Sequence, residues 1–330
     1  MAFVGREQEL AELAEALQRA AEGEMGRVVL AGSAGIGISS LLDELESRLA
    51  DVPGIIVARG HATEPRSALP YAVLAEALGD ALAALTDEPF KAVVGPAAHD
   101  LAALLPAISP RLDALGIGRE APALEAAEQI GSRVAESLRG TLERLALAGV
   151  VLLALEDLHW SDPATRRFVE SLQDIAAPLS VCLLISYRPD ELHRRHPARD
   201  FLSRLSRAPG VRIIEPAPLS DAELAVLCAE LDGERPSGSF LAALSEGSAG
   251  NPLLATQLIT AHRALEGLRL SDPFDEVLSA RLDALSGGAL RAVRLLAADD
   301  PEVRRAQALF APGAPELLGA APVRRRAPAG

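Results

Sequence analysis

The sequence predicts an α/β fold in which helices cover both faces of a parallel sheet, followed by a small all-helical domain. Three observations predict it. Short apolar segments alternate with amphipathic stretches up to Ile214, a glycine-rich turn joins the first such segment to a helix, and only helical patterns follow Pro218. Apolar strands that alternate with helices are typical of parallel sheets buried on both faces.

The first elements are an amphipathic helix, two strands and a long helical stretch. Residues 7–21 repeat leucine and alanine with the spacing of one helix face. Apolar runs and leucine spacing then predict a strand at 27–31, a helix at 39–49 and a strand at 54–58. The alanine-rich stretch 70–147 is broken by prolines, and it predicts inserted helices rather than strands.

Three mainly apolar runs predict the rest of the sheet, and the first of them is wholly apolar. They lie at 150–155, 180–186 and 211–214, and helical stretches are expected after Pro163 and Pro197. Each run ends close to polar residues, as buried parallel strands do where they leave the sheet.

The part of the chain after Pro218 is predicted to be a separate helical domain. With Ser220 as the first capping residue, helical patterns occupy 221–231, 240–246, 252–265, 273–285 and 289–298. We therefore expect a first domain over 1–217 with inserted helices at about 70–147, a helical domain over 218–298, and a poorly ordered tail rich in Ala, Pro and Arg over 299–330.

Composition narrows the classes of function. The formal net charge of −14 opposes a broad DNA-binding surface, and the one dense basic run is 324–326, so we expect no direct DNA binding by this chain. Cys182 and Cys228 lie apart in apolar stretches, which suits a reducing compartment. With no signal-peptide pattern and no apolar run long enough to span a bilayer, we expect a cytoplasmic protein without a membrane partner.

A candidate phosphate-binding loop lies between the first strand and the next helix. Residues 32–39 read Gly-Ser-Ala-Gly-Ile-Gly-Ile-Ser, in the context that the G-x-x-x-x-G-K-[ST] motif requires. Glycines let the backbone wrap a phosphate while N–H groups at the helix start point toward it. The candidate nucleotide-binding residues of this loop are Gly32, Gly35, Ile36, Gly37, Ile38, Ser39 and Ser40. Ser39 matches the hydroxyl that reaches Mg²⁺.

One position of the motif departs from the pattern, because Ile38 stands where the lysine is expected. That lysine places a positive charge on the β- and γ-phosphates. Charge-assisted hydrogen bonds contribute roughly 1.5–3 kcal/mol each, so nucleotide affinity would fall by about ten- to a hundredfold, and hydrolysis would suffer more. The alternative is a glycine-rich turn that binds no phosphate.

Two further strand ends carry candidate catalytic groups. Glu156 and Asp157 follow the apolar run 150–155, and phosphoryl transfer needs one carboxylate for Mg²⁺ and one to orient water. Which acid has which role stays open, and plain loop acids are the alternative. Ser186 and Arg188 end another strand and could sense the γ-phosphate, although a solvent-facing arginine is the alternative.

Four motifs carry a family resemblance, in order along the chain. They are Phe-Val-Gly-Arg-Glu at 3–7, Glu-Asp-Leu-His-Trp-Ser-Asp-Pro at 156–163, Ser-Tyr-Arg-Pro-Asp-Glu-Leu at 186–192 and Gly-Asn-Pro-Leu at 250–253. Together they resemble signal-transduction ATPases with numerous domains (STAND), a branch of the AAA+-like P-loop proteins, of the kind found in large LuxR-type transcription regulators. The resemblance covers about 3–285.

The resemblance implies a sheet order of 5-1-4-3-2 and a helical lid that is closed with ADP and open with ATP. It places Phe3, Val4 and Gly5, followed by Arg6, near the adenine, and Pro252 against the nucleotide from the lid. Glu156 and Asp157 would serve Mg²⁺ and water, and Arg188 would sense the phosphate. His159 and Trp160 would shape their loop rather than do chemistry.

The sequence therefore predicts an ATP/ADP-binding switch module with weak or absent hydrolysis, which contacts a protein partner or associates with itself when ATP is bound. Relatives continue into a winged helix and helical repeats, so a complete protein, a fragment and a truncated regulator all stay open. One alternative is an active ATPase in which Arg6, Arg59 or Arg188 replaces the missing lysine charge. Another is a remnant without function.

Overall fold

The computed structural model describes residues 3–63, 69–118, 127–173 and 178–263. The described residues divide into two compact units, a larger one within 5–217 and a smaller one formed by residues 3–4 and 218–263. The larger unit contains the sheet, and the smaller unit contains helices α10 to α12.

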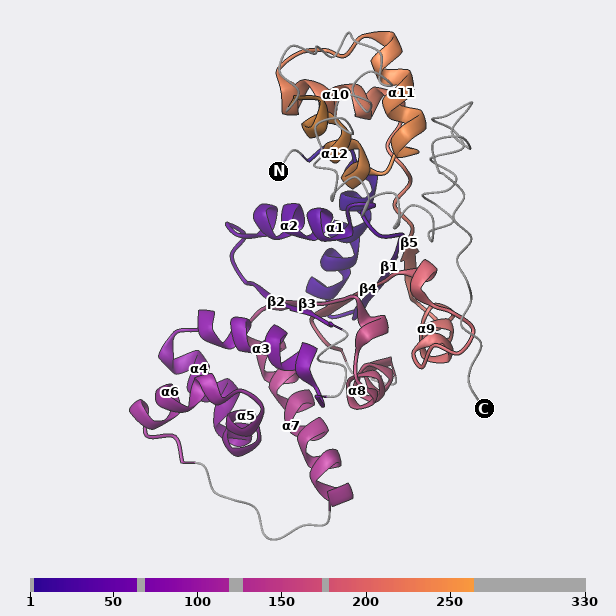
Figure 1. Ribbon diagram of the computed structural model, residues 1–330. Coiled ribbons are helices and arrows are strands. Elements are labelled where there is room, and N and C mark those ends of the chain that lie inside the picture. Colours follow the sequence, from indigo (N-terminus) through magenta and orange to yellow (C-terminus); the bar gives the residue numbers. More distant parts are fainter. Residues whose placement is uncertain (1–2, 64–68, 119–126, 174–177, 264–330) are drawn as a thin grey trace, which may run out of the picture. The chain divides into compact units, whose positions relative to one another are not determined.

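A five-stranded parallel sheet forms the centre of the larger unit (Figure 1). Its strands are β1 (Gly26–Ala31), β2 (Ile55–His61), β3 (Val150–Glu156), β4 (Val181–Tyr187) and β5 (Arg212–Ile214). They lie in the order β2-β3-β4-β1-β5, and every neighbouring pair is parallel. Read from the β5 edge, this is the predicted order 5-1-4-3-2, which is confirmed.

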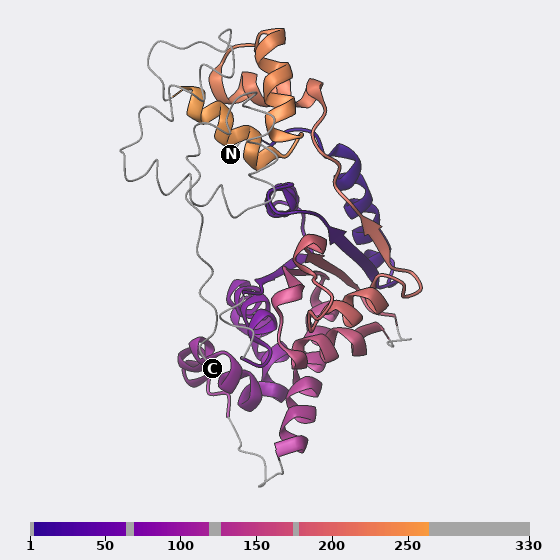
Figure 2. The same ribbon diagram turned by 45° about the vertical axis from the view of Figure 1, so that its right-hand side comes forward.

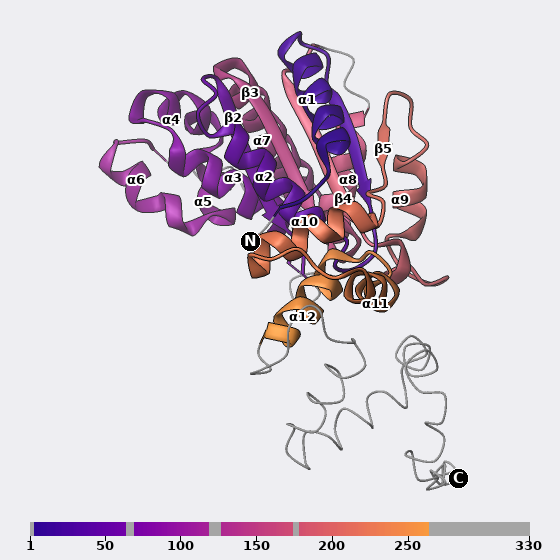
Figure 3. The same cartoon turned by 90° about the horizontal axis from the view of Figure 1, so that it is seen from above.

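Helices cover both faces of this sheet. Helices α1 (Glu7–Ala21) and α2 (Ile38–Leu49) lie on one face, as Figures 1 and 3 show. The other face is covered by α3 (Ala72–Ala84), α7 (Ala127–Ala148), α8 (Pro163–Gln173) and α9 (Arg199–Leu205). Because both faces are covered, the central strands β3 and β4 are buried almost throughout, which explains why apolar residues fill both strands up to their last residues.

The stretch between β2 and β3 is helical, as its alanine-rich pattern predicts. Besides α3 and α7 it contains α4 (Asp87–Val94), α5 (Ala98–Leu104) and α6 (Ser109–Ala114), joined by 3-10 turns at Gly95–Ala97 and Pro106–Ile108. Prolines occupy the first positions of these turns and of α6, where a helix lacks an N–H partner in any case. Phe90, Leu101 and Leu138 are fully buried among these helices.

Strand β2 is longer than the sequence pattern predicts, since it runs through Arg59 and Gly60 to His61. A Cβ at Gly60 would lie 2.1 Å from the carbonyl oxygen of Val73, so only glycine lets α3 approach the strand this closely. The predicted end of this strand at Ala58 was wrong because polar residues pair there with the end of β3.

The smaller unit is built from α10 (Asp221–Asp232), α11 (Gly238–Ser248) and α12 (Pro252–Arg263), which pack against one another (Figure 2). Ser220 caps α10 in a reciprocal capping box with Glu223, which confirms the predicted cap. Phe240 is buried in the core of this unit, and Val4 packs against that core.

The helices expected at 273–285 and 289–298 and the tail expected at 299–330 lie outside the described residues. Within the described part of the chain, no helix combines the length and the apolar character needed to cross a membrane.

Candidate functional site

The glycine-rich loop leaves β1 and enters α2 with two residues in the left-handed region. Gly35 has φ 79° and Gly37 has φ 99°, which glycine adopts without the steric cost of a Cβ. A Cβ on Gly32 would lie 2.6 Å from Cγ2 of Ile36, so the loop is also closely packed. No side chain among the described residues caps α2 at Gly37. Uncapped N–H groups at a helix start behind a glycine turn are the arrangement that binds phosphate.

Arg6 fixes the back of this loop. Its Nη2 donates to the carbonyl oxygen of Ile36 at 3.0 Å, and its Nη1 donates to Glu9 and to the carbonyl oxygen of Ala217. Arg6 and Ile36 are both buried. This geometry gives Arg6 a role in holding the loop, and its predicted contact with the nucleotide stays a prediction.

Ser39, Glu156 and Arg59 meet at the first turn of α2. The hydroxyl of Ser39 donates to Oε2 of Glu156 at 2.8 Å, and Nε of Arg59 donates to Oε1 of the same carboxylate at 2.6 Å. Because Arg59 pairs with Ala154 in the sheet register and side chains alternate along a strand, Arg59 and Glu156 point to the same face. The three residues therefore come from separate elements that the register brings together.

The guanidinium of Arg59 also reaches α2. It donates to Asp43 at 2.6 Å and to Glu46 at 3.0 Å. Burial tends to lower the pKa of Arg59, but its hydrogen bonds with Glu156 and Asp43 outweigh burial and raise that pKa above its ordinary value. Arg59 is therefore a permanent cation beside Glu156. The sequence named it only as one of three alternatives, and it did not indicate this partner.

Asp157 meets the end of β4. Its backbone has φ 50°, and its N–H donates to the hydroxyl of Ser186 at 2.9 Å. Its carboxylate accepts from Nη2 of Arg188 at 2.9 Å, and Nε2 of His61 lies 3.5 Å away. The structure thus brings together the predicted residues Asp157, Ser186 and Arg188, because β3 and β4 are neighbours and end at the same edge.

A second carboxylate continues this network away from the strand ends. Nη1 of Arg188 donates to Glu191 at 2.8 Å, and Nε2 of the buried His159 lies 2.9 Å from the other oxygen of Glu191. Burial tends to raise the pKa of Glu191, but hydrogen bonds from His159 and Arg188 outweigh it and hold that pKa below its ordinary value. Glu191 thus carries a charge that orients Arg188, a role the sequence pattern did not indicate.

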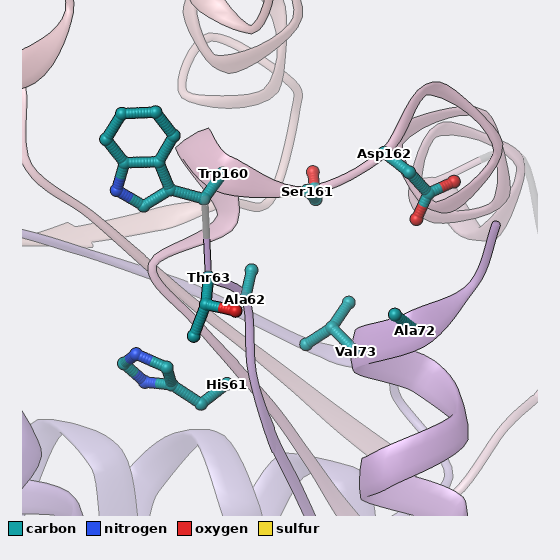
Figure 4. A pocket seen from close by; sticks show the side chains of 8 residues that line it. All are labelled: His61, Ala62, Thr63, Ala72, Val73, Trp160, Ser161 and Asp162. Atoms are coloured by element: carbon teal, nitrogen blue, oxygen red, sulfur yellow. The ribbon is translucent and has the colours of Figure 1, made fainter. Parts of the chain in front are cut away.

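The end of the Glu-Asp-Leu-His-Trp-Ser-Asp-Pro motif is structural. Asp162 is buried, and Oδ1 accepts from the N–H groups of Ala164 and Thr165 at the start of α8. Its Oδ2 accepts from the N–H of Tyr71, just before α3. Figure 4 shows Asp162 and Trp160 on opposite sides of a small cavity. With a volume of about 10 Å³, that cavity is far too small for a nucleotide.

The donor atoms beside the loop fit Mg²⁺. The hydroxyl of Ser39 and the carboxylate of Glu156 are hard oxygen donors, which Mg²⁺ prefers, and they are already in contact. Among the described residues, no group of three or more His, Cys, Asp or Glu side chains is arranged to hold a metal ion. Two protein oxygens with phosphate and water would complete the coordination that Mg²⁺ usually has.

The remaining predicted residues belong mainly to the smaller unit, which contains Phe3, Val4 and Pro252. There the Gly-Asn-Pro segment starts α12: Oδ1 of Asn251 accepts from the N–H groups of Leu253 and Leu254, and Pro252 is the first helical residue. These contacts explain the segment structurally, and the nucleotide contacts of Phe3, Val4 and Pro252 stay predictions.

A parallel sheet of this order, with a glycine loop that feeds a helix beside an acidic strand end, defines a P-loop nucleotide-binding fold. Residues 2–185 match the family model of the AAA ATPase domain. The match covers more than half of the chain, so the chain belongs to this family.

Several solved structures are similar to the chain at low identity. Cdc6p from Pyrobaculum aerophilum shares 14% identity over 80% of this chain and 63% of its own, with a TM-score of 0.48. Orc1 from Aeropyrum pernix shares 18% identity over 98% of this chain and 80% of its own, with a TM-score of 0.49. A STAND protein with a tetratricopeptide repeat sensor from Pyrococcus horikoshii shares 15% identity over 91% of this chain and 35% of its own, with a TM-score of 0.42. The chain thus spans less than two thirds of the first and third of these proteins. No curated protein matches the sequence.

Proposed function

We propose that the chain is an ATP/ADP-binding switch module of a LuxR-type signal-transduction regulator, with weak or absent hydrolysis because Ile38 replaces the loop lysine. The observation that carries this proposal is the contact between Ser39 and Glu156 at 2.8 Å. It joins a hydroxyl and a carboxylate suited to Mg²⁺ beside a glycine loop suited to phosphate. This contact supports a site that binds Mg²⁺ and nucleotide without the lysine.

Weak hydrolysis follows from the charges around the loop. Negative charge grows on the transferring phosphoryl group in the transition state, and the lysine normally stabilises it. The side chain of Ile38 has no charge, and Lys91, the only lysine of the chain, lies on α4 among the inserted helices. Arg188 already binds both Asp157 and Glu191. Binding can persist through backbone N–H groups, whereas turnover loses its main electrostatic support.

The alternative of an active ATPase with a substitute arginine has one observation in its favour. Arg59 lies against Glu156 and so brings a cation close to the proposed magnesium site. Nevertheless, two further carboxylates hold its guanidinium, which limits its movement toward a phosphate.

The regulatory part of the proposal rests on the order of the four motifs and on the acidic composition. A module of this kind would contact a protein partner, or a second copy of itself, in the ATP-bound state. The net charge of −14 argues against direct DNA binding by this chain. We also propose that it acts in the cytoplasm.

Calorimetric titration of the native chain with Mg·ADP and Mg·ATP tests the proposal. Fluorescence of Trp160 provides a second signal, because this single tryptophan lies close to Asp157 in the chain and its backbone N–H donates to the carbonyl oxygen of that residue. We expect saturable binding of both nucleotides, and clearly weaker binding by Gly37→Ala because a Cβ is strained at φ 99°. Gly118→Ala is the matched control, since a Cβ there meets open space. No binding by a folded native chain would refute the proposal.

A further inference from the structure

The three arginines that could replace the missing lysine charge are engaged in different ways. Arg6 holds the carbonyl oxygen of Ile36, and Arg188 holds Asp157 and Glu191. Only Arg59 contacts Glu156, the acid that also accepts from Ser39, and its Nη2 lies 3.5 Å from the carbonyl oxygen of Ser39. Of these three arginines, the one that contacts the proposed magnesium site therefore comes from β2.

We propose that Arg59 is a positioning residue that supplies, from β2, the positive charge that the loop motif assigns to a lysine at position 38. This inference rests on the proposed function. In this arrangement the charge reaches the phosphate site from the side of Glu156 rather than from the loop itself.

Burial explains why a cation is needed at this place. The Glu156 side chain is only 5% exposed, and a buried carboxylate without a partner is strongly unfavourable. Arg59 binds one carboxylate oxygen and leaves the other directed at Ser39. It thus compensates the charge of Glu156 and fixes its orientation at the same time.

Asp43 and Glu46 weaken the electrostatic field of Arg59 much less than Glu156 does. The Asp43 side chain is 68% exposed and that of Glu46 is 34% exposed, so water screens both ion pairs. The pair with Glu156 is screened least. Once Mg²⁺ and a nucleotide engage Glu156, part of the positive charge of Arg59 is left to face the phosphates.

Because the guanidinium of Arg59 is held in place, it affects the binding of nucleotide and the hydrolysis of ATP differently. A lysine on a flexible stem can follow the phosphoryl group as charge develops, whereas a guanidinium held by three carboxylates stays in place. Arg59 therefore supports affinity for the bound nucleotide but gives little extra stabilisation to the transition state.

A double-mutant cycle tests this role. The dissociation constants of Mg·ADP and Mg·ATP are measured by calorimetry for the native chain, Arg59→Met, Ile38→Lys and the double variant, with circular dichroism to verify folding. We expect Arg59→Met to weaken binding by about tenfold. Ile38→Lys should strengthen binding by less than about threefold in the native background but by about tenfold in the Arg59→Met background, because the two charges serve one site.

Two controls make the cycle decisive. Arg48→Met removes an arginine of α2 that is paired with Glu44 and Glu7 at the surface, and it should leave affinity unchanged. If Arg59→Met does not fold, Glu156→Gln is compared with Glu156→Gln/Arg59→Met, in which the buried acid is absent and only the more exposed Asp43 and Glu46 lose Arg59 as a partner. The second of these should still bind nucleotide more weakly.

The possible failures can be told apart. Equal strengthening by Ile38→Lys in both backgrounds, or native affinity in Arg59→Met, would overturn the role of Arg59 and leave the proposed function standing. A folded native chain that binds no nucleotide would overturn both.

Discussion

The hydroxyl of Ser39 donates a 2.8 Å hydrogen bond to Oε2 of Glu156, across 117 positions of sequence. It joins the first turn of α2 to the end of β3, two elements that the parallel sheet order brings side by side. Two oxygens suited to Mg²⁺ are therefore in contact with each other.

Ser39→Ala should remove most of the effect of Mg²⁺ on nucleotide binding. The variant lacks the hydroxyl that would bind the ion, so the gain in ATP affinity on adding Mg²⁺ should shrink by about tenfold. Calorimetry with Mg²⁺ and with a chelator measures this gain. Ser39→Thr retains a hydroxyl and should resemble the native chain, and an unchanged gain in Ser39→Ala would contradict the placement of the metal site.

Arg188→Met should destabilise the larger unit. Asp157 has a side chain only 12% exposed, and Glu191 depends on the same guanidinium, so the loss leaves two carboxylates with fewer partners. Charge-assisted hydrogen bonds at such partly buried groups suggest a loss of about 1–2 kcal/mol in the free energy of unfolding. Urea unfolding measures it. Arg204→Met is the control, because that arginine is 65% exposed and should contribute little. Equal losses of unfolding free energy in the two variants would show that the ion pairs of Arg188 stabilise the protein no more than an exposed ion pair does.

Stability should fall as the pH drops below neutrality, in part because of His196. Burial lowers the pKa of His196 below its ordinary value, and His159, His193 and Arg166 nearby lower it further, while Glu191 acts in the opposite direction. Its Nδ1 also accepts from the N–H of Ala198, which requires that nitrogen to be unprotonated. The unfolded chain therefore binds a proton more readily than the folded one, so this stability is present above the unfolded pKa and is lost as the pH falls through the folded one.

His196→Asn tests this pH dependence, because asparagine can accept the same hydrogen bond but does not titrate. Urea midpoints are compared at about pH 7.5 and about pH 5, the range in which histidines titrate. The native chain should lose more stability over this range than His196→Asn. Identical losses of stability in the two proteins would show that His196 does not cause the pH dependence.

The sheet was predictable from the sequence because its strands are buried on both faces. Apolar runs such as 150–155 are typical of strands in a sheet covered on both faces, and the order of the strands followed from the family resemblance. The last residues of β2 were not predictable, because Arg59 and His61 are polar and only their pairing with Ala154 and Glu156 makes them strand.

The residues of the candidate site were predictable from the sequence, but the contacts between them were not. The sequence named Ser39, Glu156, Asp157, Ser186 and Arg188 from strand ends and motif positions. It could not show that Arg59 binds Glu156 or that Glu191 binds Arg188, because these contacts depend on sheet register and on loop geometry. The Asp162 contacts likewise link α8 to the start of α3, which no local pattern encodes.

The most direct test of the central claim is the rate of ATP hydrolysis by the native chain, Ile38→Lys and Glu156→Gln under saturating Mg·ATP. If Ile38 limits turnover, the native rate should stay near that of Glu156→Gln, and Ile38→Lys should raise it by about tenfold or more. A native rate that Glu156→Gln abolishes and Ile38→Lys leaves unchanged would contradict the claim. It would show an active ATPase that does not need the lysine.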